Sequence, residues 1–340
     1  MRTVDGSQGE GGGQVLRTTL ALSLLSGEAV TLENIRARRA RPGLMRQHLA
    51  AVQLAARVGD AEVEGAAQGS RRLVFRPRTV ATGRFEMSVA TAGSATLVLQ
   101  TVLPALLVAK GPTTLVLEGG THNPLAPPYD FLAESFLPLV NRMGPTVEAR
   151  LERWGFYPAG GGRMVVSIRP AERLAPLELL DTGPVKRVGA RAVVAGLPPD
   201  IARRELAALA RRLGWAPERL RIEERPAAEG PGNVLIASLE REQVTEVVTG
   251  FGEKGRSAEA VAEAVATEVE AYLQAGVPVG THLADQLLIP MALAGAGAFR
   301  TLPLSLHART QVRLLEELTA ARFEVREAAG ITEVSVAARA

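Results

Sequence analysis

The sequence predicts an α/β (α+β) fold of three repeated units, with a smaller α/β domain inserted between the second and third. First, an apolar helix, a strand, a second helix and closing strands recur in the same order, with a period of roughly 80 to 90 residues. Second, the first two units end alike, with Phe75-Arg76-Pro77 and Ile168-Arg169-Pro170. Third, residues 171 to about 275 interrupt this order. Three such units can form a pseudo-threefold body.

The first unit begins with a helix in which Leu16, Leu20 and Leu24 recur every four residues, and Gly27 ends it. Further along we expect a strand at residues 30–32, a helix at 44–57, and strands at 61–64 and 72–77. The second unit repeats this order, with helices at 96–109 and 129–143 and strands at 114–117, 146–151 and 163–170. The third has helices at 282–293 and 310–320, with strands around Phe323 and Val334.

A Pro-containing linker over residues 176–184 opens the interruption. We expect a strand at 188–194, a helix at 201–213, a hairpin at 234–248 and a long helix at 257–273, whose apolar stripe indicates a buried face. The predicted domains are therefore residues 1–175 (repeats one and two of the main body), 176–275 (the inserted α/β domain) and 276–340 (the third repeat).

The composition, 46% hydrophobic and 22% charged over 340 residues, is that of an ordinary soluble globular protein. The chain has no cysteine, which excludes disulfides, thiolate zinc sites and a cysteine nucleophile and suits a cytoplasmic location. The longest apolar stretches, 97–109 and 287–299, fall short of the ~20 residues of a membrane span, so we expect no membrane contact. Only Lys110, Lys186 and Lys254 are lysines, and none lies in a P-loop or in a Lys-x-Asp-Gly nucleotidylation motif.

A glycine loop, Gly9-Glu10-Gly11-Gly12-Gly13-Gln14, leads directly into the first helix. Such a loop lets a ligand approach the backbone, and the free N–H groups of a helix start attract anions. Glu10 would repel a bare phosphate, but it could hold a divalent cation that bridges to phosphate oxygens. The alternative is a flexible strand-to-helix turn, because Gly-rich loops are weak motifs by themselves.

Five arginines crowd the segment between the first unit's strand and its second helix: Arg36, Arg38, Arg39, Arg41 and Arg46. Guanidinium groups can clamp phosphates bidentately, although a charge run is often only a solvated face. The adjacent Gln47 and His48 favour a binding site, since their polar groups continue the cluster into the helix.

His307 lies just before the last amphipathic helix, in what we expect to be a loop fixed by two rigid elements. A largely neutral imidazole near pH 7 can attack phosphorus as a nucleophile. A single histidine is more often structural, so its context must decide.

The string Gly155-Phe156-Tyr157-Pro158-Ala159-Gly160-Gly161-Gly162 resembles the signature of RNA 3'-terminal phosphate cyclases. The segments at residues 5–14, 41–48, 92–106 and 283–286 resemble that family too, so the likeness spans nearly the whole chain. It implies three βαβαββ-type repeats, similar to the C-terminal domain of translation initiation factor 3, and a smaller inserted α/β domain. No obligate protein partner is evident.

The resemblance also implies a reaction. A histidine takes AMP from ATP and passes it to an RNA 3'-phosphate, and the neighbouring 2'-hydroxyl then displaces AMP to leave a 2',3'-cyclic phosphate. His307 would be the nucleophile, and Glu10 would hold the divalent metal, Mg or Mn. The phosphate or RNA 3'-end site would comprise Arg17, Arg36, Arg39, Gln47 and His48. The adenylate site would comprise Gln100, Pro127, His282, Leu283, Ala284, Asp285 and Gln286, with Pro127 against the adenine face.

Three residues depart from the family pattern. His282 stands where a tyrosine usually stacks on adenine, so nucleotide binding or preference could differ. Trp154 replaces a basic residue, and Gln311 stands where asparagine is common. Two other readings stay open. One is an enolpyruvyl transferase acting on a phosphorylated small acid, and the other is a non-catalytic relative that holds RNA in ribosomal RNA processing. The presence of His307 argues against the second.

Overall fold

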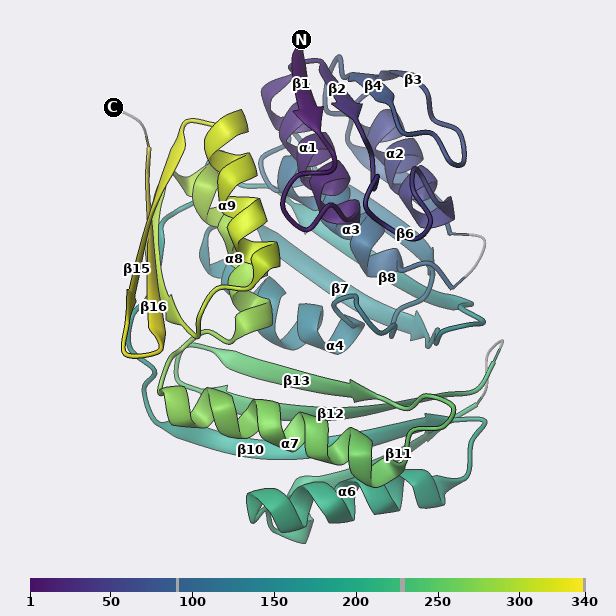
Figure 1. Cartoon of the computed structure of the whole chain (residues 1–340), viewed down its shortest axis with the longest axis vertical. Coiled ribbons are helices and arrows are strands. Elements are labelled where there is room, and N and C mark those ends of the chain that lie inside the picture. Colours follow the sequence, from purple (N-terminus) through teal and green to yellow (C-terminus); the bar gives the residue numbers. More distant parts are fainter. Residues whose placement is uncertain (90–91, 227–229, 339–340) are drawn as a thin grey trace.

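The computed structural model describes residues 1–89, 92–226 and 230–338. Within these ranges the chain has a mixed α/β fold with four four-stranded sheets, each of which contains parallel and antiparallel strand pairs. Figure 1 shows the helices of residues 13–142 and 281–318 gathered together, with a further sheet and the helices of residues 199–275 beside them. None of the helices in the described ranges combines the length and the apolar composition that a bilayer span needs.

The N-terminal sheet has the order β1-β2-β4-β3, with β1 parallel to β2 and the other pairs antiparallel. The helix α1 starts at the glycine loop, as the sequence predicts, with Gly12 as its N-cap and Gly27 as its left-handed C-cap. The elements are β1 (Arg2–Asp5), α1 (Gly13–Ser26), β2 (Val30–Glu33), α2 (Arg46–Val58), β3 (Glu62–Glu64) and β4 (Leu73–Arg76).

The second sheet has the order β5-β6-β8-β7 and the same pattern of one parallel and two antiparallel pairs. The helix expected at residues 129–143 contains a π-helical segment, η1, in which the Leu137 amide donates to the Leu132 carbonyl. The following Pro138 has no N–H to continue an α-helical ladder. The elements are β5 (Gly83–Ser88), α3 (Ala95–Leu106), β6 (Thr113–Gly119), α4 (Tyr129–Phe131), η1 (Leu132–Phe136), α5 (Leu137–Arg142), β7 (Thr146–Arg153) and β8 (Gly162–Arg169).

The third sheet has the order β15-β16-β14-β9. Its strand β9 lies within the segment that the sequence assigns to the inserted domain, yet it pairs in parallel with β14, with Leu179 opposite Phe299. The boundary drawn at residue 176 therefore separates β9 from the sheet to which it belongs. The elements are β9 (Leu177–Leu179), α8 (Thr281–Ala294), β14 (Ala296–Thr301), α9 (Leu306–Leu318), β15 (Ala321–Ala328) and β16 (Ile331–Ala338).

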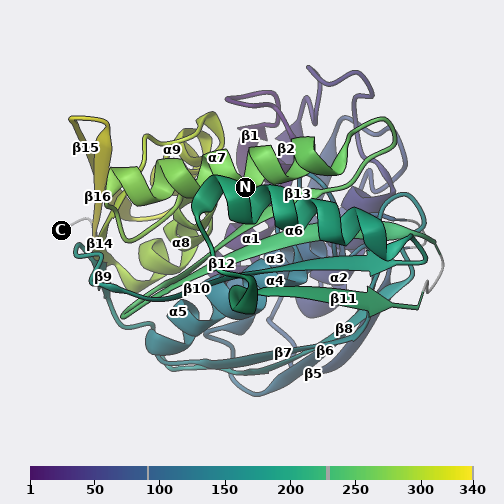
Figure 2. The ribbon, with the colours of Figure 1, turned by 90° about the horizontal axis from the view of Figure 1, so that it is seen from below.

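The fourth sheet has the order β11-β10-β12-β13, and its two central strands have buried residues on both faces. Ala192, Val194 and Leu235 pack under α6 and α7 in one cluster, whereas Val193 and Ile236 join the large core that the other three sheets share. Figures 1 and 2 show α6 and α7 together on the side of this sheet that faces away from the other sheets. The elements are β10 (Val185–Ala195), α6 (Pro199–Leu213), the 3-10 helix η2 (Pro217–Arg219), β11 (Leu220–Arg225), β12 (Gly232–Arg241), β13 (Thr245–Phe251) and α7 (Ala258–Ala275).

The glycine-rich segment at residues 155–162 is held in place by close backbone packing. A Cβ atom on Gly155 would lie 2.3 Å from the Gly162 nitrogen and 2.5 Å from the Gly119 carbonyl oxygen. We therefore expect Gly155→Ala to lower the free energy of unfolding by about 1–3 kcal/mol, measured by urea denaturation. Gly111→Ala is the control, because its Cβ would meet only the Thr82 side chain, 3.2 Å away. Equal losses for the two variants would contradict this explanation.

Candidate active site

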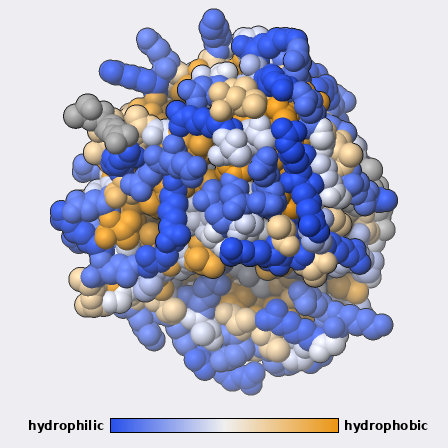
Figure 3. Space-filling view, turned by 45° about the horizontal axis from the view of Figure 1, so that its top comes forward, coloured by the Kyte–Doolittle hydropathy of each residue, from blue (hydrophilic) through white to orange (hydrophobic). Residues whose placement is uncertain are grey.

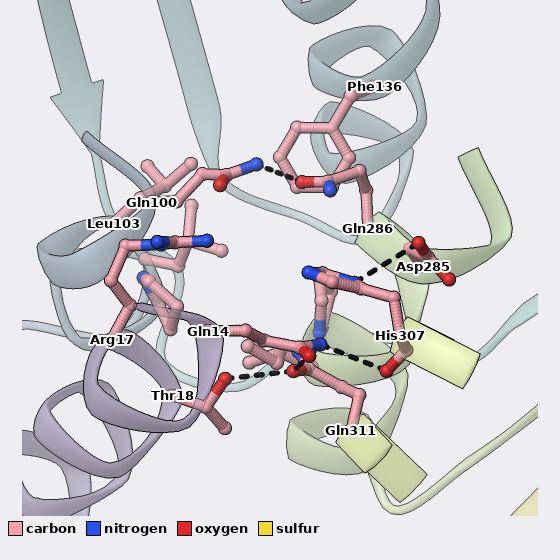
Figure 4. A pocket seen from close by; sticks show the side chains of 14 residues that line it. Gln14, Arg17, Thr18, Gln100, Leu103, Phe136, Asp285, Gln286, His307 and Gln311 are labelled. Carbon is pink, nitrogen blue, oxygen red and sulfur yellow. Dashed lines mark hydrogen bonds and ion pairs between the residues drawn. The ribbon is translucent and has the colours of Figure 1, made fainter. Parts of the chain in front are cut away.

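A pocket lies where α1, α3, η1, α8 and α9 meet (Figure 4). Its wall combines an apolar strip from α3, η1 and α8 with polar side chains from α1, α8 and α9. The lining residues are Gln14, Arg17, Thr18, Gln100, Leu103, Pro104, Leu107, Phe136, Asp285, Gln286, Ile289, Pro290, His307 and Gln311. A few polar groups against an apolar wall is the usual make-up of a small-molecule site.

His307 is not in a loop, as the sequence suggested, but in the first turn of α9. The reason is local: the Ser305 hydroxyl caps the helix by accepting the Ala308 N–H at 2.9 Å, so the helix starts four residues earlier than expected. The N-terminus of α9 therefore delivers the imidazole directly to the pocket.

Asp285 on α8 holds this first turn. Its Oδ1 accepts the Ser305 hydroxyl proton at 3.0 Å, and its Oδ2 lies 3.1 Å from His307 Nδ1, at ion-pair distance but without hydrogen-bond geometry. A carboxylate beside Nδ1 favours the tautomer with its proton there. The Nε2 lone pair is then free to act as a nucleophile.

A buried amide network joins α1 to α9. Gln14 Nε2 donates to Gln311 Oε1 at 2.8 Å and to the His307 carbonyl at 3.1 Å, and the Thr18 hydroxyl donates to the same Gln311 oxygen at 2.8 Å. These buried hydrogen bonds fix the relative place of the two helices. Gln311, one of the departures from the family pattern, thus has a structural role in this chain.

The glycine loop packs against α9. Gly9 adopts a φ of +57°, and a Cβ atom there would lie 2.1 Å from the Thr310 Oγ1 atom, which also accepts the Glu10 N–H at 3.3 Å. The Glu10 carboxylate forms an ion pair with Arg39. Within the described residues, no three His, Cys, Asp or Glu side chains gather into a group that could hold a metal ion.

Two nitrogen-rich side chains meet at the start of α1. A Cβ atom on Gly13 would lie 2.5 Å from His48 Nε2 and 3.1 Å from Arg17 Nη1, so this glycine leaves room for both. Burial lowers the pKa of Arg17 to about 10, against an opposing effect of Glu10. Arg17 has no hydrogen-bond or ion-pair partner in the described part of the chain. A desolvated cation at a helix N-terminus is a site for an anion.

His48 is buried and neutral. Burial, then the charges of Arg36 and Arg17, lower its pKa to about 3. Its Nδ1 accepts the Met45 N–H at 3.0 Å, so the ring proton is on Nε2, the atom nearest Gly13. The imidazole is therefore a neutral donor at the start of α1.

A model of the family described as RNA 3'-terminal phosphate cyclase matches residues 8–325. The chain belongs to this family. A protein named RNA 3'-terminal phosphate cyclase from Koribacter versatilis is 49% identical over 339 residues, which cover 100% of this chain and 96% of the relative. One with the same name from Ralstonia nicotianae is 50% identical over 315 residues, 92% of this chain and 90% of the relative. The pocket lies wholly within the part that matches the cyclase family.

The fold gathers only some of the residues that the cyclase resemblance assigns to the adenylate site. Gln100, Asp285 and Gln286 line the pocket, and the Gln100 amide donates to Gln286 across it. Leu283 and Ala284 are buried, so only their backbone could meet a ligand. The other two lie off the pocket wall: Pro127 in the segment before α4, and His282 with a side chain 69% exposed and 3.6 Å from Glu268.

The residues assigned to the phosphate or RNA end also differ in their surroundings. Arg17 lines the pocket, with His48 beside it, while Arg39 pairs with Glu10. Arg36 has a φ of 53° and donates to the carbonyls of Arg41 and Gly43, so it braces the arginine-rich loop. Gln47 accepts the Ser94 N–H at 3.5 Å, beside the start of α3.

Sequence reasoning missed four lining residues with clear roles: Gln14, Thr18, Phe136 and Gln311. A signal existed for three of them. Gln14 and Thr18 are four residues apart, as are His307 and Gln311, and this spacing places each pair on one helix face. Polar pairs that share one face of a helix with apolar residues indicate a buried polar contact. No comparable pattern distinguishes Phe136 from the core phenylalanines.

The burial of His48 predicts a pH effect on stability. Below about pH 6.5 the unfolded chain protonates this histidine, whereas the folded chain does not until the pH nears its own pKa of about 3. Stability should therefore fall as the pH falls through this window. Because the Asn amide oxygen can replace Nδ1 as acceptor, His48→Asn should remove about 1 kcal/mol of this loss per pH unit. Urea unfolding at pH 7 and pH 5 measures the free energy of unfolding of both proteins. An equal loss between the two pH values in wild type and in His48→Asn would contradict the prediction.

Proposed function

We propose that this chain converts an RNA 3'-terminal phosphate to a 2',3'-cyclic phosphodiester at the expense of ATP, with His307 as the nucleophile. One observation carries the proposal. His307 reaches the pocket with a carboxylate 3.1 Å from its Nδ1, and Arg17, a cation without an ion-pair partner among the described residues, lines the same pocket. A nucleophile and a phosphate-binding cation are the two parts that nucleotidyl transfer needs first.

In the first step Nε2 of His307 attacks the α-phosphorus of ATP, an N–P bond forms, and the bond to diphosphate breaks. The imidazole keeps its Nδ1 proton and becomes cationic, and the neighbouring Asp285 carboxylate stabilises that charge. Positioning and charge stabilisation account for most of the catalysis of such transfers. A phosphoramidate on histidine also fits a chain that has only three lysines, none in a nucleotidylation motif.

In the second step an oxygen of the RNA 3'-phosphate attacks the phosphorus of the adduct, which forms RNA(3')pp(5')A and frees His307. In the third step the 2'-hydroxyl attacks the RNA phosphorus and AMP leaves. Activation is needed because an oxygen of a phosphate monoester is a poor leaving group, whereas AMP leaves an anhydride readily. The products are AMP, diphosphate and the cyclic phosphate.

The adenylate would lie along the apolar strip of the pocket, with Gln100, Asp285 and Gln286 as polar contacts and the backbone of Leu283 and Ala284 below. Pro127 and His282 would contact the base only if it extended beyond the wall of the pocket. The RNA phosphate would lie at the start of α1, where Arg17 and His48 supply donors and Arg36, Arg39 and Gln47 lie on the arginine-rich side. Much of the face in Figure 3 is hydrophilic, which suits a polyanionic substrate.

A divalent cation fits this arrangement with Glu10 as its protein ligand. Mg²⁺ and Mn²⁺ accept a single carboxylate together with substrate phosphates and waters, so a cluster of protein ligands is not required. The cation would neutralise charge on the phosphate oxygens. Arg39, which pairs with Glu10, would then be released toward the phosphates.

We also infer that the first three sheets are repeats around which the fourth is inserted. In each of the three sheets, the first and second strands of the unit pair in parallel, and the other two pairs are antiparallel. The fourth strand of the unit lies next to the second, and the third strand forms the far edge. The fourth sheet instead begins with its central strand β10 and adds β11 beside it. The division into 1–175, 176–275 and 276–340, a cytoplasmic location and the lack of an obligate protein partner remain predictions.

The decisive test is incubation with α-labelled ATP and a divalent metal, followed by denaturing electrophoresis. We expect an acid-labile protein adduct that His307→Ala abolishes, since a phosphoramidate bond is cleaved in acid. Asp285→Asn should slow adduct formation by about 10- to 100-fold, because the imidazolium loses its countercharge. His282→Ala is the control for loss of an exposed histidine and should still form the adduct.

Each other outcome rejects part of the proposal. An adduct on the His307→Ala variant would exclude His307 as nucleophile. RNA binding without any adduct would favour the non-catalytic relative. Turnover of shikimate 3-phosphate without nucleotide would favour an enolpyruvyl transferase.

The metal role of Glu10 has its own test. Glu10→Ala should lower the rate of adduct formation by about 10- to 100-fold and weaken its dependence on Mg²⁺ or Mn²⁺ concentration. Glu28→Ala is the matched control, because Glu28 also pairs with an arginine, Arg2 at 2.8 Å, but lies beyond the opposite end of α1 from the glycine loop. An unchanged metal dependence in Glu10→Ala would make the glycine loop only a strand-to-helix turn.

A further inference from the structure

The fourth sheet contacts two elements of the pocket wall with charged groups. From β10, Arg191 pairs with Asp130 and Glu134 of α4 and η1, and η1 carries Phe136 to the pocket. From β13, Glu246 reaches the start of α8. Figure 1 shows β13 as the strand of this sheet nearest to α8 and α4. The sheet thus supports the pocket from outside.

The contact of Glu246 with α8 is close and buried. The side chain is 3% exposed, and its Oε2 accepts the Gly280 N–H at 2.9 Å. Gly280 is the N-cap of α8 and has no side chain to satisfy the helix start. A Cβ atom there would lie 2.4 Å from the Glu246 Oε1 atom, so the glycine makes room for the carboxyl group. A residue of another sheet therefore caps α8.

The capped helix carries the groups that place the nucleophile. One turn along, Asp285 binds the Ser305 hydroxyl and lies 3.1 Å from His307 Nδ1, and the next residue, Gln286, is bonded to Gln100. Displacing the first turn of α8 would move these contacts together. Misplacement of catalytic groups by about 1 Å can cost 100-fold in rate.

We infer that Glu246 is a positioning residue for the adenylation site: it caps α8 from the fourth sheet and thereby sets the place of Asp285 and His307. The inference rests on the proposed function for its kinetic test, but the geometry it describes exists without nucleotide.

The surroundings of Glu246 give a second readout. Burial raises its pKa to about 8, the Gly280 N–H opposes this, and the charge of Glu268 on α7 adds to it. The other facing groups are Tyr272 on α7, Arg241 on β12, which lies over the Tyr272 ring, and His282 on α8, which is 3.6 Å from Glu268. The carboxyl group is thus mostly protonated near pH 7, and Glu246→Gln imitates that form.

The kinetic test compares adduct formation in Glu246→Ala and Glu246→Gln. We expect a loss of about tenfold or more in the first-order rate for Glu246→Ala, and a rate within about threefold of wild type for Glu246→Gln near pH 7. Above about pH 8 the wild-type rate should depart from that of Glu246→Gln, since only the carboxyl group ionises there. Identical pH profiles, or a full rate in Glu246→Ala, would overturn the inference.

Glu205→Ala is the matched control. Glu205 is also a buried glutamate of this part of the chain, with a pKa raised to about 7 by burial, but it bonds Asn233 on β12, at 2.9 Å, instead of α8. Its loss should lower thermal stability without slowing adduct formation by the folded protein. If the two alanine variants slow adduct formation equally at equal folded fractions, Glu246 has only a general structural role.

Hydrogen–deuterium exchange of ligand-free protein separates this inference from the proposed function. Glu246→Ala should raise exchange about fivefold or more in residues 280–286, and Glu205→Ala should not. If wild type forms no adduct, the proposed function fails, but the exchange comparison still tests whether Glu246 positions α8. If Glu246→Ala does not fold, Glu246→Gln decides: exchange equal to wild type above about pH 8, together with an unchanged pH profile of the rate, would overturn the inference.

Discussion

The pocket depends on the buried contact between α1 and α9, helices from opposite ends of the chain. Gln14 and Thr18 meet Gln311 across 297 and 293 positions of sequence, and the same Gln14 amide holds the His307 carbonyl. Because an unsatisfied buried amide costs about 1–3 kcal/mol, the two helices are held in one register. The glycine loop before α1 and the imidazole in α9 share a site only because this register is fixed.

The charge distribution at the start of α1 follows from the same constraint. Arg17 is a desolvated cation without an ion-pair partner in the described residues, and a second charge on His48 would repel it across Gly13. The neutral imidazole avoids that repulsion and still offers a donor. An incoming phosphate would then supply the negative charge that the fold leaves out, and would recover part of the cost of burying Arg17.

The sequence predicts the long helices well, because α1, α3 and α7 have strong apolar patterns bounded by glycine or serine caps. It misses the parallel strands β1 and β5, which are largely exposed edge strands, and the edge strand β9, which has only three residues. It also misses β14, whose Ala296 and Gly297 resemble a turn. Residue types and positions indicated His307 and Glu10 as candidates, and the resemblance to the cyclase family added Arg17. Their partners Asp285 and Arg39 were named for other roles, since spacing cannot show which distant side chains meet.

The fourth sheet is part of the architecture that supports the pocket rather than an appended module. Alternate residues of β10 and β12 are buried on opposite faces, so removal of the sheet would uncover the apolar side chains of the remaining core against which Val193 and Ile236 pack. It would also leave Asp130 without its arginine and α8 without its cap. One face of this sheet packs on α6 and α7, and the other packs toward the pocket wall. The edge strand β13 must therefore keep its position relative to α8. Variation in such a domain is therefore freest in α6, on the outer face, and most restricted along β10 and β13.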